Sequence, residues 1–333
     1  MTDRITLAHG AGGALTRKLM RQVFLRHLHN PELSALGDSA PLNITSDRIA
    51  FTTDNFVVDP IFFPGGDLGK LAVCGTVNDL AVSGAEPKYI SAGLIIEEGY
   101  PLDDLDKLVI SMANASFESG VKVVCADVKV VERGKADGVF INTSGLGVDT
   151  EKISCEPVNP GDIVIISGTV GDHEIAVISA RIDFHIKTSI VSDCAPLTPL
   201  IRTLLDQVQG IKMMRDPTQG GIATLLCKWV ESSSYGVEIR EKDIPIAPNI
   251  RSICQILGLD PLYLANQGKA ALICRPSDAQ RVIDIMHKNP LSRDAAIIGE
   301  VWDDFPGKVI LQTETEGKKI LEMRAGEGSY RVC

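Results

Sequence analysis

Residues 48–98 read RIAFTTDNFVVDPIFFPGGDLGKLAVCGTVNDLAVSGAEPKYISAGLIIEE, and this stretch decides the fold. The segment at 48–57 has the composition of a strand. Small residues at 66–85 predict a helix, and the segment at 88–98 predicts a second strand. A strand, a helix and another strand in this order favour an α/β fold.

The alternation continues on both sides of one break. Residues 101–120 predict a helix that begins with Pro101 and acidic residues and ends at Gly120, and 121–131 and 138–148 predict two more strands. Turn formers fill 149–161, which we take as the domain boundary. Beyond it, strands are predicted at 162–168, 236–241, 270–275, 295–301 and 308–313, and helices at 171–181, 197–208, 220–233 and 277–289.

The predicted fold class is therefore α/β, with mixed sheets in two domains rather than one doubly wound sheet. An N-terminal segment with a glycine-rich loop covers residues 1–40, the N-terminal domain covers 41–150 and the C-terminal α/β domain covers 151–322. Residues 323–333 form a polar tail, and we expect both the tail and the N-terminal loop to be flexible.

Composition limits the class of protein and its partners. The chain has 333 residues, 44% hydrophobic and 23% charged, which suits a globular protein of two domains. A net charge of −10 without a basic run argues against nucleic acid. No apolar stretch approaches the roughly 20 residues of a membrane span, and the first residues lack a signal-peptide pattern. We expect a cytoplasmic protein without membrane contact, in which an anionic ligand needs a bridging cation.

Three aspartates are candidate ligands of such a cation. Asp54 and Asp127 each follow an apolar strand segment, and Asp79 lies among the small residues of the predicted helix. Carboxylates gathered at strand ends suit Mg²⁺ that bridges to phosphate oxygens. Each aspartate could equally be a turn or helix-cap residue. The chain has neither a GxxxxGK[ST] loop nor a GxGxxG fingerprint.

A glycine-rich loop and two basic side chains are further candidates. The loop AHGAGG could place its N–H groups around phosphates, or it could simply be mobile. It contains His9, Gly10, Gly12 and Gly13. His173, at the start of a predicted helix, is either catalytic or a hydrogen-bonded structural residue. Lys129 could meet a charge near Asp127 or could be an outward-facing strand residue.

The cysteine pattern ends at an unusual position. Eight cysteines occur without a CxxC pair or a zinc-ligand spacing, and in a reducing compartment we expect thiols. Cys74, Cys125 and Cys274 lie in apolar segments and are predicted to fill the core. The chain ends GEGSYRVC, so Cys333 closes a polar tail. A thiol at this place is either accidental or functional.

A resemblance to a known family bears on this thiol. The similar segments are LAHGAGG at 7–13, residues 51–91, GDH at 171–173, VSDCAPLTPLI at 191–201, MRDPTQGG at 214–221, NQGK at 266–269 and the ending RVC. In this order they resemble the HypE family of hydrogenase maturation factors. That family belongs to the superfamily of aminoimidazole ribonucleotide (AIR) synthetase, selenophosphate synthetase and thiamine monophosphate kinase. The resemblance runs essentially from end to end, and the terminal cysteine separates the family from its superfamily relatives.

The resemblance implies an ATP-dependent reaction on Cys333. A HypF-type carbamoyltransferase would place a carbamoyl group on the thiol, and the chain would use ATP and Mg²⁺ to phosphorylate the carbamoyl oxygen. Loss of phosphate would leave a thiocyanate. Its cyano group would pass to iron in a HypC–HypD complex, as the cyanide ligand of a [NiFe]-hydrogenase. Because the tail carries the group, the chemistry would be intramolecular.

The resemblance also implies roles for the motif residues. Asp54, Asp79 and Asp127 would hold Mg²⁺, and with Asn78 and the loop residues His9, Gly10, Gly12 and Gly13 they would bind ATP; Lys129, His173, Asp216, Asn266 and Gln267 would line the catalytic pocket that receives Cys333. The fold would be the two-domain AIR-synthetase-like arrangement, in which N-terminal domains pair in a homodimer.

Five positions depart from the family pattern, namely Ala126, Val128, Glu174, Gln219 and Gln267. Gln267 stands where the family has a glutamate, and it cannot act as a carboxylate base for the carbamoyl nitrogen. The departures leave a second interpretation open, a catalytically weakened carrier that presents a modified Cys333 to partner proteins. A third, a synthetase or kinase of small molecules, gives the terminal thiol no role.

Overall fold

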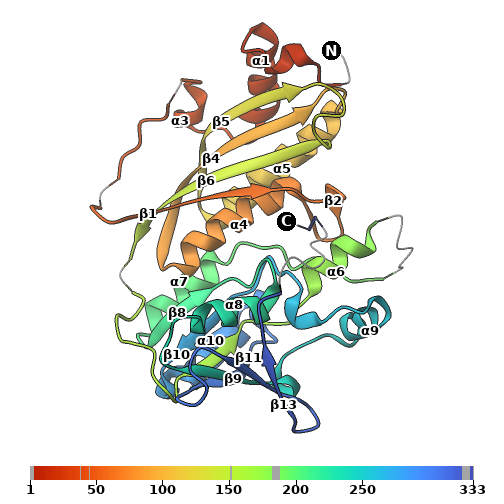
Figure 1. Cartoon of the computed structure of the whole chain (residues 1–333). Helices are drawn as coiled ribbons and strands as arrows, with labels where there is room; N and C mark the ends of the chain where they lie inside the picture. The colour runs from red at the N-terminus through yellow and green to blue at the C-terminus, as the bar shows by residue number, and fades with distance from the viewer. Residues whose placement is uncertain are drawn as a thin grey trace.

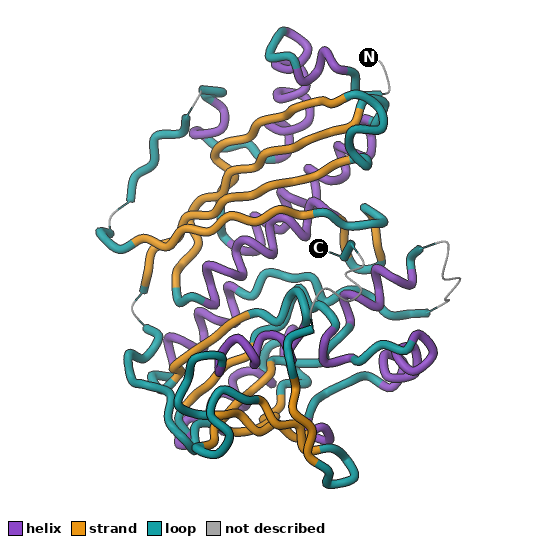
Figure 2. The backbone as a smooth tube through the Cα atoms, viewed as in Figure 1, coloured by secondary structure: helices purple, strands orange, loops and turns teal. Residues whose placement is uncertain are grey.

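The computed structural model describes residues 4–37, 39–44, 46–150, 152–181, 188–324 and 331–332. One sheet organises the N-terminal half and another the C-terminal half, and helix α4 (Leu68–Val82) contacts elements of both (Figure 1). Figure 2 shows strands of each sheet with helices packed against them. Within these described ranges, no helix has both the length and the apolarity needed to cross a bilayer.

The N-terminal sheet has the strand order β1-β6-β4-β5. Its strands are β1 (Ile49–Phe56), β4 (Ala85–Glu97), β5 (Lys122–Val131) and β6 (Val139–Asp149). β6 pairs antiparallel with β1 and β4, and β4 pairs parallel with β5. Burial alternates along β1 and β6, as in a sheet with one covered face. Helices α4 and α5 (Leu102–Ser119) contribute to the core on that face.

The other face of this sheet, which we call the open face, carries large apolar side chains. Ile49 is 53% exposed, Phe51 is 68% exposed and Ile95 is 45% exposed. Apolar groups of this size rarely gather on an exposed surface without a binding partner.

Helix α4 is buried on nearly every side, and its small residues make that possible. A Cβ atom on Gly69 would lie 2.2 Å from the carbonyl oxygen of Leu108 in α5, and one on Gly75 would lie 2.6 Å from the Phe56 ring. Asp67 caps the helix by accepting the Lys70 N–H at 2.9 Å. A helix without a polar face fits only between two layers of structure.

Short helical segments at the N-terminus pack along the β5 edge and against α5. They are η1 (Leu7–Gly10), α1 (Ala14–Leu19), η2 (Met20–Phe24), α2 (Leu25–His27) and α3 (Pro31–Ser34). Gly10 allows the close approach, because a Cβ atom there would lie 2.3 Å from the Val130 nitrogen. A hairpin of β2 (Phe62–Phe63) and β3 (Gly66–Asp67) leads into α4.

The C-terminal sheet has the order β13-β12-β9-β11-β7-β10-β8, and only the β9–β12 pair is parallel among these neighbours. Its strands are β7 (Ile163–Ile166), β8 (Ile211–Arg215), β9 (Gly236–Arg240), β10 (Ala271–Cys274), β11 (Ala296–Trp302), β12 (Val309–Gln312) and β13 (Lys318–Leu321). The helices are α6 (Asp172–Ser179), α7 (Thr198–Gln207), α8 (Gly221–Val230), α9 (Pro248–Leu257) and α10 (Pro276–His287), with the short turns η4 (Glu241–Asp243), η5 (Pro261–Tyr263) and η6 (Pro290–Ser292). Helix α8 packs in one core cluster, and α7 and α10 pack in another that uses alternate residues of the same strands.

The structure confirms the predicted α/β fold with two mixed sheets. It corrects one detail of the sequence interpretation. Asp54 and Asp127 do not follow their strands but lie inside β1 and β5, because both strands stay paired beyond the aspartate. The N-terminal helical segments, β8, α9 and β13 were not expected from the sequence pattern.

Candidate functional site

Three carboxyl groups meet where the two domains touch. Asp54 comes from β1, Asp79 from the last turn of α4, and Asp216 directly follows β8. The Asp79 carboxyl lies close enough to Asp54 and Asp216 for the three groups to affect one another's ionisation. The structure therefore brings together three of the residues that the sequence singles out, and we call them the acidic cluster.

The carboxyl groups of the acidic cluster hinder one another's ionisation. Burial and the charge of Asp79 raise the pKa of Asp216 to about 8. Burial and the charge of Asp54 raise the pKa of Asp79 to about 6, and burial also raises the pKa of Asp54. Carboxylates held this close share protons. Near neutral pH the cluster therefore holds protons that a cation could displace.

Hydroxyl groups from three elements orient these carboxylates. The Thr76 hydroxyl of α4 donates to Asp54 Oδ2 at 3.0 Å, and the Thr52 hydroxyl of β1 donates to Asp79 Oδ2 at 3.2 Å. Thr143 Oγ1 of β6 lies 2.6 Å from Thr76 Oγ1. Sequence reasoning missed these threonines, because only the packing of α4 on the sheet brings them to the aspartates.

The acidic cluster suits a divalent cation without forming a complete cage for one. Within the part of the chain that the structure describes, no group of three or more His, Cys, Asp and Glu side chains has the arrangement of a metal site. Mg²⁺ commonly takes one or two protein carboxylates and completes its shell with phosphate oxygens and water. Asp54 and Asp79 offer hard oxygen ligands of this kind, so the residues fit an ion that arrives with a phosphate.

Asn78 joins the two domains next to this cluster. Its Nδ2 donates to the carbonyls of Ala195 at 3.1 Å and Gln267 at 3.2 Å, and its Oδ1 accepts the Leu197 N–H at 2.7 Å. The residue is 1% exposed. Both side-chain N–H groups are thus used for contacts between domains, which fixes the position of the neighbouring Asp79.

Asn266 ties together two loops of the C-terminal domain. Its Oδ1 accepts the Gly171 N–H at 2.8 Å, and its Nδ2 donates to the carbonyls of Pro217 at 3.1 Å and Leu264 at 3.0 Å. The side chain is fully buried. Asn266 therefore links the start of α6 to the loop that carries Asp216.

The end of the chain enters the same junction beside α6. The Arg331 carbonyl accepts the Asp59 N–H at 3.0 Å and a hydrogen bond from Arg181 Nη2 at 3.0 Å. Val332 forms an antiparallel bridge with Val58 and is 6% exposed. The last described residues are therefore docked between the domains.

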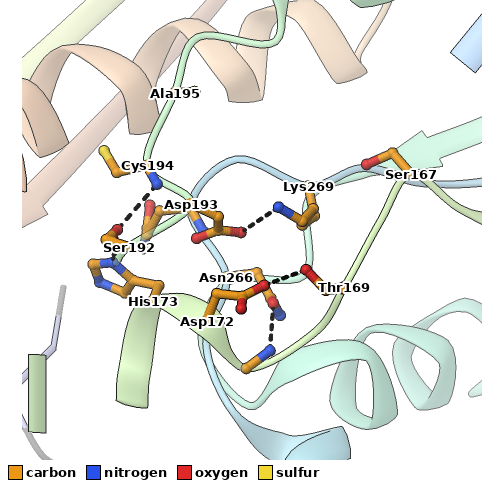
Figure 3. Close-up of polar contacts among 12 residues, drawn as sticks. Ser167, Thr169, Asp172, His173, Ser192, Asp193, Cys194, Ala195, Asn266 and Lys269 are labelled. Carbon is orange, nitrogen blue, oxygen red and sulfur yellow. Dashed lines mark hydrogen bonds and ion pairs between the residues drawn. The ribbon is translucent and has the colours of Figure 1, made fainter. Parts of the chain in front are cut away.

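His173 holds the chain immediately before the terminal residue. Its Nε2 lies 2.6 Å from the Val332 carbonyl oxygen, and its Nδ1 lies 2.8 Å from the Ser192 hydroxyl, which Figure 3 shows beside the ring. Cys333 itself lies outside the described residues. Its nitrogen, however, is bonded to the carbonyl carbon that His173 holds.

Polar residues that the sequence did not single out as site residues lie near His173 and Ser192 (Figure 3). The Gln267 N–H donates to Asp193 Oδ1 at 3.0 Å, and Lys269 Nζ lies 3.3 Å from Asp193 Oδ2 (Figure 3). The Thr169 hydroxyl donates to Asp172 in the same view. Asp193 and Lys269 occur in segments that carry the family resemblance, which is the one sequence signal that could have marked them.

Asp127 and Lys129 are not brought to the acidic cluster. They lie on the open face, 70% and 66% exposed at their side chains, with 3.9 Å between Lys129 Nζ and Asp127 Oδ2. Asp127 is three strands from Asp54, about 14 Å at ordinary strand spacing, and points to the other face of the sheet. One ion cannot contact both carboxylates within a single copy. Ala126 and Val128, two of the positions that depart from the family pattern, alternate with Asp127 and Lys129 along β5, and their side chains pack in the core.

The glycine-rich loop is also apart from the acidic cluster. It lies at the β5 edge, whereas Asp54 lies on β1 at the opposite edge. His9 is buried there, and its Nδ1 accepts the Thr6 N–H at 3.1 Å. A cleft of about 620 Å³ adjoins His9. Its basic lining residues are Lys18, Arg21 and Arg26.

The other three positions that depart from the family pattern lie in different surroundings. Glu174 is buried, and its Oε2 accepts the Ala265 N–H at 2.7 Å, so this carboxylate supports a loop. Burial raises the pKa of Glu174. Gln267 is 3% exposed and lies in the junction, whereas Gln219 is exposed.

Comparisons with known proteins agree with this architecture. The description "AIR synthase related protein, N-terminal domain" matches residues 36–148, and "AIR synthase related protein, C-terminal domain" matches residues 159–312. The chain is thus a two-domain protein of the AIR synthase related class. It is 44% identical to the carbamoyl dehydratase HypE of Rhizobium leguminosarum bv. viciae, over 99% of this chain and 95% of that protein. The chain belongs to the HypE family of carbamoyl dehydratases, as the sequence resemblance predicts.

Solved structures support the same assignment. The crystal structure of the hydrogenase maturation protein HypE in complex with ATP is similar at a TM-score of 0.94 and 40% identity, covering 98% of this chain and 99% of that one. The structure of a HypE–HypF complex is similar at a TM-score of 0.80 and 44% identity, covering 94% of this chain and 100% of that one.

We predict that Asp79→Asn stabilises the folded chain at pH 8 in buffer that contains a chelator. The raised pKa values mean that the folded cluster binds more protons than the unfolded chain between about pH 4 and pH 8, so its contribution to stability falls as pH rises. Removing one charge should raise the free energy of unfolding by about 1–3 kcal/mol at pH 8, with little change at pH 4. Urea unfolding measures this. The exposed variant Asp303→Asn should change stability by less than about 0.5 kcal/mol, and an Asp79→Asn effect independent of pH would contradict the interpretation.

Proposed function

We propose that this chain is an ATP-dependent carbamoyl dehydratase that acts on its own terminal Cys333. A HypF-type carbamoyltransferase loads the thiol, and the chain converts the S-carbamoyl group to a thiocyanate. A HypC–HypD complex then takes the cyano group onto iron for [NiFe]-hydrogenase. The names of the relatives, the ATP complex of one HypE and the HypE–HypF complex support this assignment. The reaction needs a free thiol, which a reducing cytoplasm maintains.

The chemistry balances as the removal of one water at the cost of one ATP. The carbamoyl oxygen attacks the γ-phosphorus, ADP leaves, and the nitrogen loses one proton. The C–O bond then breaks with loss of phosphate, the nitrogen loses its second proton, and a C≡N bond remains on the sulfur. Phosphorylation is needed because phosphate is a far better leaving group than hydroxide.

The single observation that carries the proposal is the docked end of the chain. The Val332 carbonyl is held by His173 at the start of α6, and Asn266 ties that start to the loop of Asp216. Residue 332 is thereby docked in the junction that contains the acidic cluster, and the tail would deliver the Cys333 thiol there. Delivery of a bound substrate in this way makes the reaction intramolecular, which can be worth many powers of ten in rate.

Asp54 and Asp79 would hold Mg²⁺, with Asp216 beside them. When bound, the ion would neutralise charge on the phosphates during transfer. The hydroxyls of Thr52 and Thr76 keep two of these carboxylates oriented. Asn78 fixes Asp79 by its contacts to the other domain.

We also propose a homodimer that forms through the open face. Ile49, Phe51 and Ile95 give this face its apolar character. Asp127 and Lys129 lie on the same face, so in such a dimer they would act at the boundary between two copies. A partner is the ordinary reason for a protein to expose apolar groups of this size.

The reaction can be followed by mass spectrometry of the C-terminal peptide. During incubation with the carbamoyltransferase, carbamoyl phosphate and Mg-ATP, the chain should first gain one carbamoyl group on Cys333. The mass of one water should then be lost from the same peptide. Cys333→Ala, which has no nucleophile in its side chain, should accept no carbamoyl group, and Gln267→Glu should not slow the second step.

Two results would count against this function. A carbamoyl group that persists through long incubation with Mg-ATP would favour the carrier interpretation. Turnover of ATP on a free small substrate by Cys333→Ala would favour a small-molecule synthetase or kinase.

We predict that Asp79→Asn abolishes nucleotide binding without unfolding the protein. The substitution removes a ligand of the ion that bridges to the phosphates. Calorimetric titration with Mg-ATP measures binding, and circular dichroism checks the fold. The exposed Asp303→Asn variant makes the same charge change and should bind as the wild type does. Unchanged affinity in Asp79→Asn would remove this aspartate from the nucleotide site.

We predict that Phe51→Glu converts the homodimer to a monomer. The substitution places a charge on the open face, which a partner sheet would have to desolvate. Light scattering coupled to size-exclusion chromatography gives the mass. Phe117, 88% exposed on α5, offers a matched control, and Phe117→Glu should leave the mass unchanged. A dimer that survives Phe51→Glu would place the interface elsewhere.

A further inference from the structure

The last described residues occupy the position of a short added strand. The Val332 bridge to Val58 is antiparallel, and the Arg331 carbonyl takes hydrogen bonds from Asp59 and Arg181. A segment bound in this way is held through its main chain, and pockets for its side chains supply selectivity. The junction is therefore built as a peptide site whose occupant is the chain's own C-terminus.

Two side chains of the tail contribute unequally to this contact. Val332 is 6% exposed and belongs to the same core cluster as Val58 and as Val177 of α6, so it fills space that both domains line. Arg331 Nη1 lies 2.7 Å from Asp137, but these side chains are 42% and 69% exposed. Exposed ion pairs contribute little. Selectivity should therefore rest on the penultimate apolar residue.

Both ring nitrogens of His173 are engaged in hydrogen bonds, so neither is free to transfer a proton. A carbonyl oxygen can only accept, so Nε2 carries the hydrogen that is donated to Val332. Burial lowers the pKa of His173, against the opposing charge of Asp193, so the ring is neutral and Nδ1 accepts from the Ser192 hydroxyl. The Ser192 oxygen in turn accepts the Cys194 N–H at 3.0 Å.

The ring is also fixed from its side. Phe63 packs edge-on against it, with 5.4 Å between ring centroids and 86° between planes. Figure 3 shows His173 and Ser192 facing each other beside Asp193 and Cys194. The sequence suggested that His173 is either catalytic or structural. In this arrangement both ring nitrogens are hydrogen-bonded, so the ring is not free to transfer protons, but it does hold the end of the chain.

We propose that His173, oriented by Ser192, is a positioning residue for the terminal thiol, and that the junction selects a C-terminal peptide with an apolar penultimate residue. The proposal rests on the proposed function for its chemical consequence. The held carbonyl is bonded to the nitrogen of Cys333, and one extended residue spans at most about 3.6 Å. Fixing this carbonyl therefore confines the carbamoyl group to the junction during phosphorylation.

Amide hydrogen exchange tests docking independently of activity. The Asp59 N–H bonds to the tail, so its exchange should quicken about 10-fold or more when Val332→Asp expels the tail. Val332→Ile keeps the apolar side chain and should leave this exchange near the wild-type rate. The Val301 amide, bonded to Asp162 within the C-terminal domain, serves as the internal reference. Unchanged Asp59 exchange in Val332→Asp would overturn the peptide site.

Single-turnover dehydration of the loaded chain tests the positioning role. His173→Gln keeps an N–H donor near the position of Nε2 and should stay within about threefold of the wild type. His173→Leu removes the donor and should slow the step about 10-fold. Equal rates for these two variants would overturn the role of the donor. Should His173→Leu fail to fold, Val332→Asp should still slow dehydration, and a wild-type rate in that variant would overturn the proposal. A wild-type chain that never dehydrates would instead refute the proposed function, while the exchange experiment would still decide the docking.

Discussion

The arrangement of the site depends on the contacts of one buried amide. Asn78 belongs to a helix of the N-terminal domain, but its three hydrogen-bonding partners are main-chain groups of the C-terminal domain. A buried main-chain group that loses its hydrogen-bonding partner costs about 1–3 kcal/mol. The hydrogen bonds of Asn78 therefore hold the two domains in one relative orientation. Asp79 is the next residue. The acidic cluster, which takes Asp54 and Asp79 from one domain and Asp216 from the other, exists only because that orientation is fixed.

Most of the fold could be predicted from local patterns. The small residues of α4, the acidic start and glycine end of α5, and the composition of most strands are local features, and each predicted the element that the structure has. Strand β8 was not predicted, because it contains the charged residue Lys212. That lysine is buried through its ion pair with Asp162 at 2.8 Å, a partner 50 residues away that no local pattern reveals.

The site was less predictable, because it depends on register and on side-chain direction. Asp54 and Asp127 look alike in the sequence, yet pairing turns one toward the covered face and the other toward the open face. Glu174 departs from the family pattern, and its structural role, the acceptance of a buried main-chain N–H, is not visible in the sequence. The threonines and Ser192 carry no motif of their own. The family resemblance supplied Asp216 and Asn266, whose roles no periodicity could indicate.

Docking makes Val332 of the tail part of the hydrophobic interior. Burial of a valine side chain contributes about 1.5–3 kcal/mol, and Val332 is 6% exposed. A polypeptide fused directly behind this segment, such as an affinity tag, must therefore extend from the junction or draw the valine out of the core. For this protein the choice of terminus for a fusion determines which state of the molecule is purified.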